Sequence, residues 1–90
     1  MDKLSKYRKQ VDKINLSIIK LIAKRIKISV KIGKYKKSKG IKIFDKKREK
    51  QVFAKLKKDA VKNKLDSKII SNIFKEIIRY SRKVQLISTN

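Results

Sequence analysis

Apolar and aromatic side chains recur at alternating intervals of three and four residues from Leu4 to Tyr35. This spacing puts them on one helix face, and the pattern predicts a single helix over residues 3–38. Such a helix would be about 54 Å long, whereas a compact domain of this size has a radius of gyration of only about 12 Å. We therefore expect the helix to extend beyond its own domain and its apolar face to meet another chain. The positions in the pattern are Leu4, Tyr7, Val11, Ile14, Ile18, Leu21, Arg25, Ile28, Ile32 and Tyr35.

Two shorter helices are predicted after the long one, and no strand. Gly40 is a candidate C-cap for the first helix, and Asp45 is a candidate N-cap for the second, which is predicted over residues 46–62. Asp66 can cap a third helix over residues 67–87. The fold class is therefore all-α, with one long N-terminal helix and two shorter helices. The second helix is expected to face inward with Val52, Phe53, Leu56 and Ala60.

The composition excludes several classes of site. With 90 residues, a single domain over residues 1–90 is expected. Because Cys and His are absent, the chain has no disulfides, no thiolate chemistry and no His general base, and we expect no metal site and no cofactor. No apolar run approaches the length of a membrane span and no signal core is present, so a cytoplasmic protein is expected.

The formal net charge of +22 has two interpretations. Basic proteins often bind nucleic acid, because neutralising phosphates releases counterions. However, 24 of the 29 basic residues are Lys and the chain is rich in Ile, a bias that A/T-rich codons would produce. We therefore interpret the charge mainly as a solvated surface, and a nucleic-acid partner is not expected.

Arg25 lies in the apolar pattern, where a charge costs free energy unless it is paired. One interpretation is that its side chain reaches solvent or pairs with a structural carboxylate. Lys36 follows eleven residues later, three helical turns plus about 20°, so the two cations share a face with Cα atoms about 16 Å apart. Lys36 alone would be a surface lysine, but together the two side chains can hold a small anion.

Polar residues on the other predicted helices suggest further parts of a site. Asp45 and Glu49 are four residues apart and share a face, which an N-cap and a first-turn acid would also explain. Arg48 lies near the positive end of the same helix dipole, where a cation is disfavoured, and this suggests an anionic partner. Ser81 and Gln85 extend the apolar face of the third helix with two neutral polar groups, either as a fraying end or as hydrogen-bonding groups in a pocket.

Arginine is scarce in this chain, so each Arg is informative. Arg8, Arg25 and Arg48 are candidates for carboxylate recognition, since Lys does not reproduce the planar two-donor geometry of Arg. Arg79 and Arg82 are interpreted as surface positions on the third helix. Several cations, two acids and two neutral polar groups together predict a pocket for a small dianion, in which charge placement and conformational restriction drive the reaction.

The sequence resembles the all-helical chorismate mutases, the AroQ class, over roughly residues 4–86. The resemblance implies three helices in an intertwined homodimer with two active sites. It also implies the Claisen rearrangement of chorismate to prephenate, on the route to Phe and Tyr. The motifs that carry it, in order, are YRKQVDKIN (7–15), LIAKRIKISVKIGKYK (21–36), IFDKKREKQV (43–52) and IFKEIIRYSRKVQ (73–85).

The resemblance further implies which residues bind the substrate carboxylates. Arg8 and Arg25 match the arginines that do so, and Arg48 and Ser81 match further polar residues on the carboxylate side. On one straight helix the Cα atoms of Arg8 and Arg25 are about 25 Å apart, and their directions differ by about 100°. One small ligand cannot contact both from the same chain, so Arg8 is expected to serve the site of the partner subunit.

The remaining matched positions imply roles at the reacting atoms. Lys36 matches the lysine that contacts a carboxylate and the ether oxygen, and Gln85 matches the glutamine at the same oxygen. Glu49 matches the acid that holds the ring hydroxyl, and Asp45 matches a second residue there. Every functional position of the family pattern is present, so an active enzyme is expected.

The chain departs from the family pattern outside these positions. Lys42 and Lys46 stand where family members often carry Pro, which puts the rigidity of the loop before the second helix in question. Arg82 stands directly after Ser81, where an apolar residue is common, and its side chain can alter the wall of the pocket.

Two other functions remain open from the sequence. An isochorismate-pyruvate lyase of the same fold also acts on a cyclic dicarboxylate, although the Asp45/Glu49 pair and Gln85 favour the mutase. A basic helical nucleic-acid-binding protein would concentrate its cations on one outer face, whereas the lysines here are spread around every predicted helix.

Overall fold

A computed structural model describes residues 2–88 and contains three helices, α1 (Lys3–Ser38), α2 (Lys46–Lys62) and α3 (Ser67–Ser88). No strand occurs in this range, so the predicted all-α class is confirmed. The helix boundaries match those expected from the sequence, except that α3 extends one residue further. No described helix is long and apolar enough to cross a membrane.

Aspartates begin all three helices. The carboxylate of Asp2 accepts a hydrogen bond from the Ser5 amide at 2.7 Å, and this bond lowers the pKa of Asp2. Asp45 accepts from the Arg48 amide at 2.9 Å, as predicted for an N-cap. Asp66 caps α3 in the same way, accepting from the amides of Lys68 and Ile69 at 2.9 and 3.0 Å.

Two helices end in a residue with left-handed backbone. After α1, Gly40 has φ 67°, and the amides of Gly40 and Ile41 donate to the carbonyls of Lys37 and Lys36 in a Schellman motif. After α2, Lys64 takes the equivalent place with φ 59°, which a residue with a Cβ rarely adopts. The sequence predicted where both helices end, the second of them at Asn63, but gave no sign of the left-handed conformation of Lys64.

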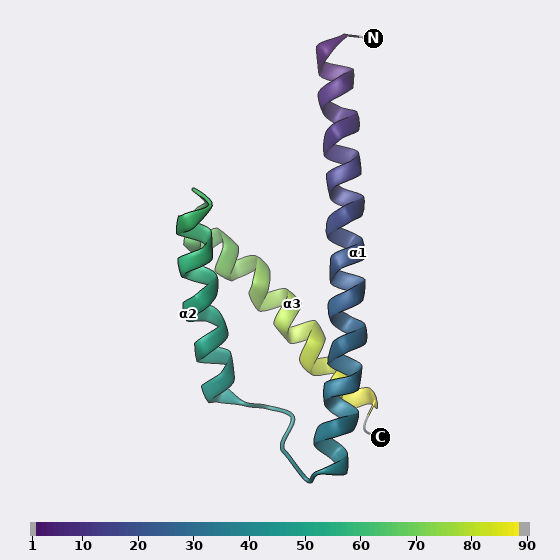
Figure 1. Ribbon diagram of the computed structural model, residues 1–90, viewed down its shortest axis with the longest axis vertical. Helices are drawn as coiled ribbons and strands as arrows, with labels where there is room; N and C mark the ends of the chain where they lie inside the picture. Colours follow the sequence, from purple (N-terminus) through teal and green to yellow (C-terminus); the bar gives the residue numbers. More distant parts are fainter. Residues whose placement is uncertain (1, 89–90) are drawn as a thin grey trace.

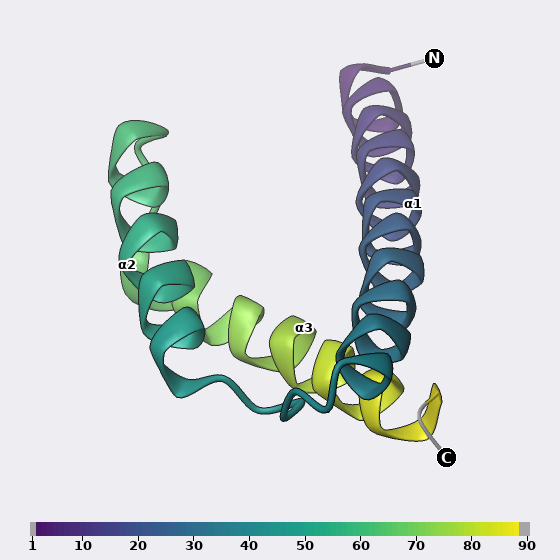
Figure 2. The ribbon, with the colours of Figure 1, turned by 60° about the horizontal axis from the view of Figure 1, so that its bottom comes forward.

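α3 joins the other two helices. In Figure 1 it runs obliquely from α2 to the lower end of α1, and Figure 2 shows α1 and α2 as two arms that rise from it. α3 contacts both arms, whereas the described parts of α1 and α2 do not contact each other. The placement of α2 relative to α1 therefore depends on α3 and on the loop of residues 39–45.

One chain buries little apolar surface. Ala60 and Ile78 are its buried hydrophobic residues among those described, while the inward-facing Val52, Phe53 and Leu56 are half-buried. The radius of gyration is 16.5 Å, well above the value of about 12 Å for a compact domain of this size. From Leu4 to Leu21 the apolar side chains of α1 remain 49–64% exposed, as expected for a helix that extends beyond its own domain.

Gly33 permits the close approach of α1 to α3. It is buried, and a Cβ at this position would lie 2.9 Å from the Cα and 3.0 Å from the carbonyl oxygen of Gln85. Both are backbone atoms, so no side-chain rotation can relieve the clash. Glycine is therefore required here for the contact itself, since α1 is regular helix at this point.

We predict that Gly33→Ala destabilises the protein. Overpacking costs roughly 1–3 kcal/mol, whereas the better helix propensity of Ala returns at most about 1 kcal/mol. The free energy of unfolding, measured in urea at one fixed protein concentration, should fall by roughly 1 kcal/mol or more. Lys34→Ala, an exposed neighbour, is the control and should change it by less than about 0.5 kcal/mol. An unchanged or higher value for Gly33→Ala would show that the two helices lie further apart.

Candidate active site

A cavity of about 440 Å³ lies between the C-terminal part of α1, the loop, the start of α2 and the second half of α3. Apolar side chains such as Ile28, Ile32 and Val52 form part of its lining. Seven of the eight site residues predicted from the sequence also line it, from three helices and up to 60 positions apart. They are Arg25, Lys36, Asp45, Arg48, Glu49, Ser81 and Gln85.

Arg25 neither reaches freely into solvent nor pairs with a carboxylate of the described chain. Its guanidinium is partly buried and donates a short hydrogen bond to the Ser81 hydroxyl, and its carbonyl accepts one from Ser29 at 3.0 Å. The pKa of Arg25 is lowered, mainly because burial disfavours the charged form and additionally because Arg48 is a nearby cation. The cavity thus holds a partly desolvated cation that has no carboxylate partner among residues 2–88, and this favours the binding of an anion.

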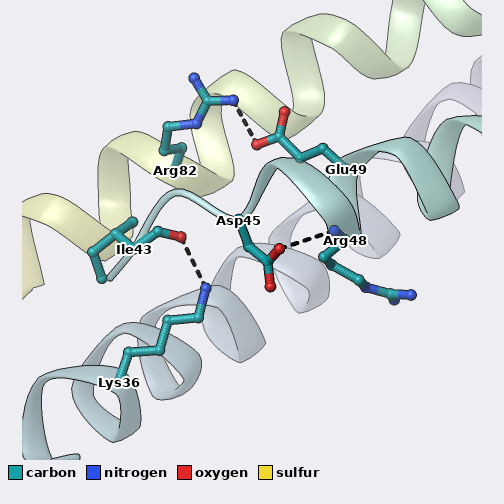
Figure 3. A network of polar contacts seen from close by, with 6 residues as sticks. All are labelled: Lys36, Ile43, Asp45, Arg48, Glu49 and Arg82. Atoms are coloured by element: carbon teal, nitrogen blue, oxygen red, sulfur yellow. Dashed lines mark hydrogen bonds and ion pairs between the residues drawn. The ribbon is translucent and has the colours of Figure 1, made fainter. Parts of the chain in front are cut away.

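Lys36 connects α1 to the loop of residues 39–45. Its Nζ donates a hydrogen bond of 2.8 Å to the carbonyl of Ile43, as Figure 3 shows. An ammonium group has three donors, so this bond leaves two for a ligand. The loop contact was not predicted, because nothing in the sequence indicates which carbonyl the lysine would meet.

The N-cap and first turn of α2 present Asp45, Arg48 and Glu49 to the cavity. Asp45 is held in place as the N-cap, and the Arg48 side chain extends away from Glu49 (Figure 3). Glu49 accepts a hydrogen bond of 2.5 Å from Arg82 of α3. Asp45 can therefore cap α2 and contact a ligand at the same time, because the Arg48 amide uses only Oδ1 of its carboxylate.

Arg82 is the residue that the sequence placed wrongly. The prediction of a surface position is correct for Arg79, which pairs with Glu76 in solvent. It is wrong for Arg82, which lines the cavity, pairs with Glu49 and lies over the Phe44 ring at 4.5 Å from its centroid. The cause is the approach of α2 and the loop to this side of α3. The unusual cation directly after Ser81 was the one available signal.

Arg8 lies outside the cavity. It is exposed near the N-terminal end of α1, which projects away from α3 in Figure 1. If Arg8 contributes to a site, it must therefore be the site of a second chain, and this role stays a prediction.

The charges of the cavity suit a dianion. Arg25, Lys36, Arg48 and Arg82 give four cations, and Asp45 and Glu49 give two carboxylates, so the lining carries a net charge of +2. Two carboxylates on one ligand would balance this charge. The partial burial of Arg25 strengthens the attraction, because charges interact more strongly where water is displaced.

Comparison with known proteins agrees with this geometry. The chain matches the family described as chorismate mutase type II over residues 7–86. It is also 32% identical over 85 residues to a chorismate mutase of Methanocaldococcus jannaschii, an alignment that covers 94% of this chain and 86% of the relative. The matched region contains all three helices almost completely and every residue of the cavity. The chain therefore belongs to the chorismate mutase type II family.

Proposed function

We propose that this protein converts chorismate to prephenate in the cavity between its three helices, and that a second copy of the chain completes each site. The observation that carries the proposal is the net charge of +2 in a partly apolar cavity. Chorismate is a dicarboxylate with an apolar ring edge, so both its charge and its shape suit this lining. The other functions considered from the sequence, a lyase and a nucleic-acid-binding protein, have no support from the family match.

The first task of the site is to select one substrate conformer. The rearrangement requires the enolpyruvyl side chain to fold over the ring, so that the new C–C bond can form as the C–O bond breaks. Arg25, supported by Ser81, would hold one carboxylate, and Arg48 would contribute to the same side. Fixing both carboxylates holds the reacting carbons in a near-attack arrangement.

The second task is to stabilise the charge that develops on the ether oxygen. Lys36 and Gln85 would donate to this oxygen from opposite helices, α1 and α3. Their bonds strengthen as the C–O bond breaks, so they favour the transition state over the bound substrate. Glu49 and Asp45 would hold the ring hydroxyl. A 10⁶-fold acceleration needs about 8 kcal/mol, a plausible sum for positioning and two preorganised donors.

The third element of the proposal is a homodimer. The apolar face of α1 from Leu4 to Leu21 is exposed, and an antiparallel α1 of a second chain would cover it. In that arrangement the partner's Arg8 comes near Arg25 and Lys36 and adds a cation to the carboxylate side. Two-fold symmetry then creates two equal shared sites.

The direct test of the function is an assay with chorismate. Purified, folded protein should consume chorismate with prephenate as the product, and activity should survive exhaustive chelation because no metal is expected. Formation of pyruvate from isochorismate, with no action on chorismate, would support the lyase instead. Folded protein that leaves chorismate unchanged would overturn the proposal.

We predict that Gln85 acts on the chemical step. Gln85→Ala should lower kcat on the order of a hundredfold, the effect of removing one donor to a developing oxyanion, and should change KM less. Gln85→Glu should regain activity toward acid pH, where the protonated carboxyl can donate again. Gln51→Ala, an exposed Gln on α2, is the control and should keep the wild-type kcat. A raised KM with unchanged kcat for Gln85→Ala would show that Gln85 only assists binding.

We predict that Arg8 acts in the site of the partner subunit. Arg8→Ala and Arg25→Ala should each be nearly inactive as homodimers. Refolded together, half of the dimers should be mixed and carry one intact site of two, so about a quarter of wild-type activity should return.

The control for this complementation is a mixture of Arg25→Ala with Lys36→Ala. Both residues line the cavity of their own chain, so every site in a mixed dimer stays damaged and no activity should return. Mixed dimers of the Arg8 and Arg25 variants that remain inactive would contradict the shared site.

A further inference from the structure

The Arg82 side chain makes two contacts at one wall of the cavity, one with α2 and one with the loop, and its Nε is buried. We infer that Arg82 is a positioning residue, which fixes Glu49 and the loop against α3. This inference rests on the proposed function, since it takes Glu49 to hold the ring hydroxyl of the substrate.

The first contact joins α3 to α2 at the site. Arg82 donates to Oε2 of Glu49 at 2.5 Å, and the two side chains are only 36% and 27% exposed. The pair between Arg79 and Glu76 on the same helix is 76% and 70% exposed and links α3 only to itself. Exposed pairs contribute little, whereas the partly buried pair with Glu49 spans two helices and restricts where the carboxylate can lie.

The second contact holds the loop. The Arg82 guanidinium lies 4.5 Å from the centroid of the Phe44 ring, within the range of a cation–π interaction. The loop lacks proline, so its backbone is not stiffened from within. Its anchors at the cavity are the hydrogen bond from Lys36 of α1 to Ile43 and this contact of Phe44 with Arg82 of α3.

The third observation concerns the buried part of the guanidinium. Nε of Arg82 is buried without a hydrogen-bond partner among the described residues. Leaving a buried donor unsatisfied lowers stability, and an apolar side chain at this position would avoid that loss. The unsatisfied Nε therefore argues that Arg82 does not serve stability alone. It is consistent with a role in orienting the Glu49 carboxylate at the site.

Glu49 can serve Arg82 and a ligand at the same time. A carboxylate accepts several hydrogen bonds on two oxygens, and Arg82 uses only Oε2. Oε1 remains for a hydroxyl of the substrate. Because α1 and α2 do not pack against each other, the distance of Glu49 from Arg25 and Lys36 is set through α3 and through the loop. Within residues 2–88, the ion pair between Arg82 and Glu49 makes the connection from α3.

The test compares Arg82→Leu, Arg82→Lys and the matched control Arg79→Leu. Arg82→Leu should lower kcat/KM by roughly tenfold or more, the size of effect seen when a residue that orients a metal-binding side chain is removed in metalloenzymes. Arg82→Lys keeps the charge and should recover part of the loss, but not all, because an ammonium cannot stack on Phe44 as a planar guanidinium does. Arg79→Leu should stay within about twofold of wild type.

A measurement without substrate separates positioning from stability. Amide hydrogen exchange of residues 41–45 should accelerate in Arg82→Leu and remain unchanged in Arg79→Leu. The melting temperature of Arg82→Leu should stay within about 4 °C of wild type, a shift that corresponds to a small change in stability. If Arg82→Leu does not fold, Arg82→Lys carries the same comparison with smaller effects.

Glu49→Gln distinguishes the failure of this inference from the failure of the proposed function. If Arg82 acts through Glu49, Arg82→Leu should add almost nothing to the loss already caused by Glu49→Gln. Wild-type kinetics in Glu49→Gln would refute the role of Glu49 in the proposed function. Impaired kinetics in Glu49→Gln with wild-type kcat/KM in Arg82→Leu would overturn the role of Arg82, even if exchange in the loop accelerates.

Discussion

α1 runs for 36 residues, and only its C-terminal part packs against another helix of the same chain. The remainder presents an apolar face that one chain leaves in solvent, although burying it would contribute roughly 25 cal/mol for each Å² removed from water. Burial of so little apolar surface makes a single chain a poor independent folding unit. This excess of helix over core explains the open shape of the chain and the exposed position of Arg8, and it motivates the proposed dimer.

The cavity differs from the exposed apolar face of α1, because here charged side chains gather where the helices of the chain pack together and bury surface. Arg25 occupies a position that the helical pattern reserves for an apolar side chain, and its depressed pKa reports the desolvation. A guanidinium remains ionised despite such a shift, so the free protein carries this unfavourable energy until an anion arrives. Binding then gains from relief of the repulsion between Arg25 and Arg48 as well as from direct contact.

The sequence was sufficient for the parts of the structure that depend on local chemistry. The spacing of apolar residues, the aspartate caps and Gly40 predicted the three helices nearly to the residue, and the family pattern named seven residues that share the cavity. It was insufficient where the outcome depends on contacts between distant segments. Lys64 ends α2 in a conformation more typical of glycine, and Arg82 turns inward because α2 and the loop reach it. The role proposed for Arg8 requires a second chain, whose position no pattern within one chain can locate.

The lack of contact between α1 and α2 has a thermodynamic consequence. A ligand bound in the cavity would contact side chains of both helices, so it would add a direct link between two helices that are otherwise connected through α3 and the loop. Its binding would then raise the free energy of unfolding by about 2.7 kcal/mol when the ligand is at a hundred times its Kd. In a chain with so small a core, occupancy of the cavity would supply a substantial part of the stability of the native state.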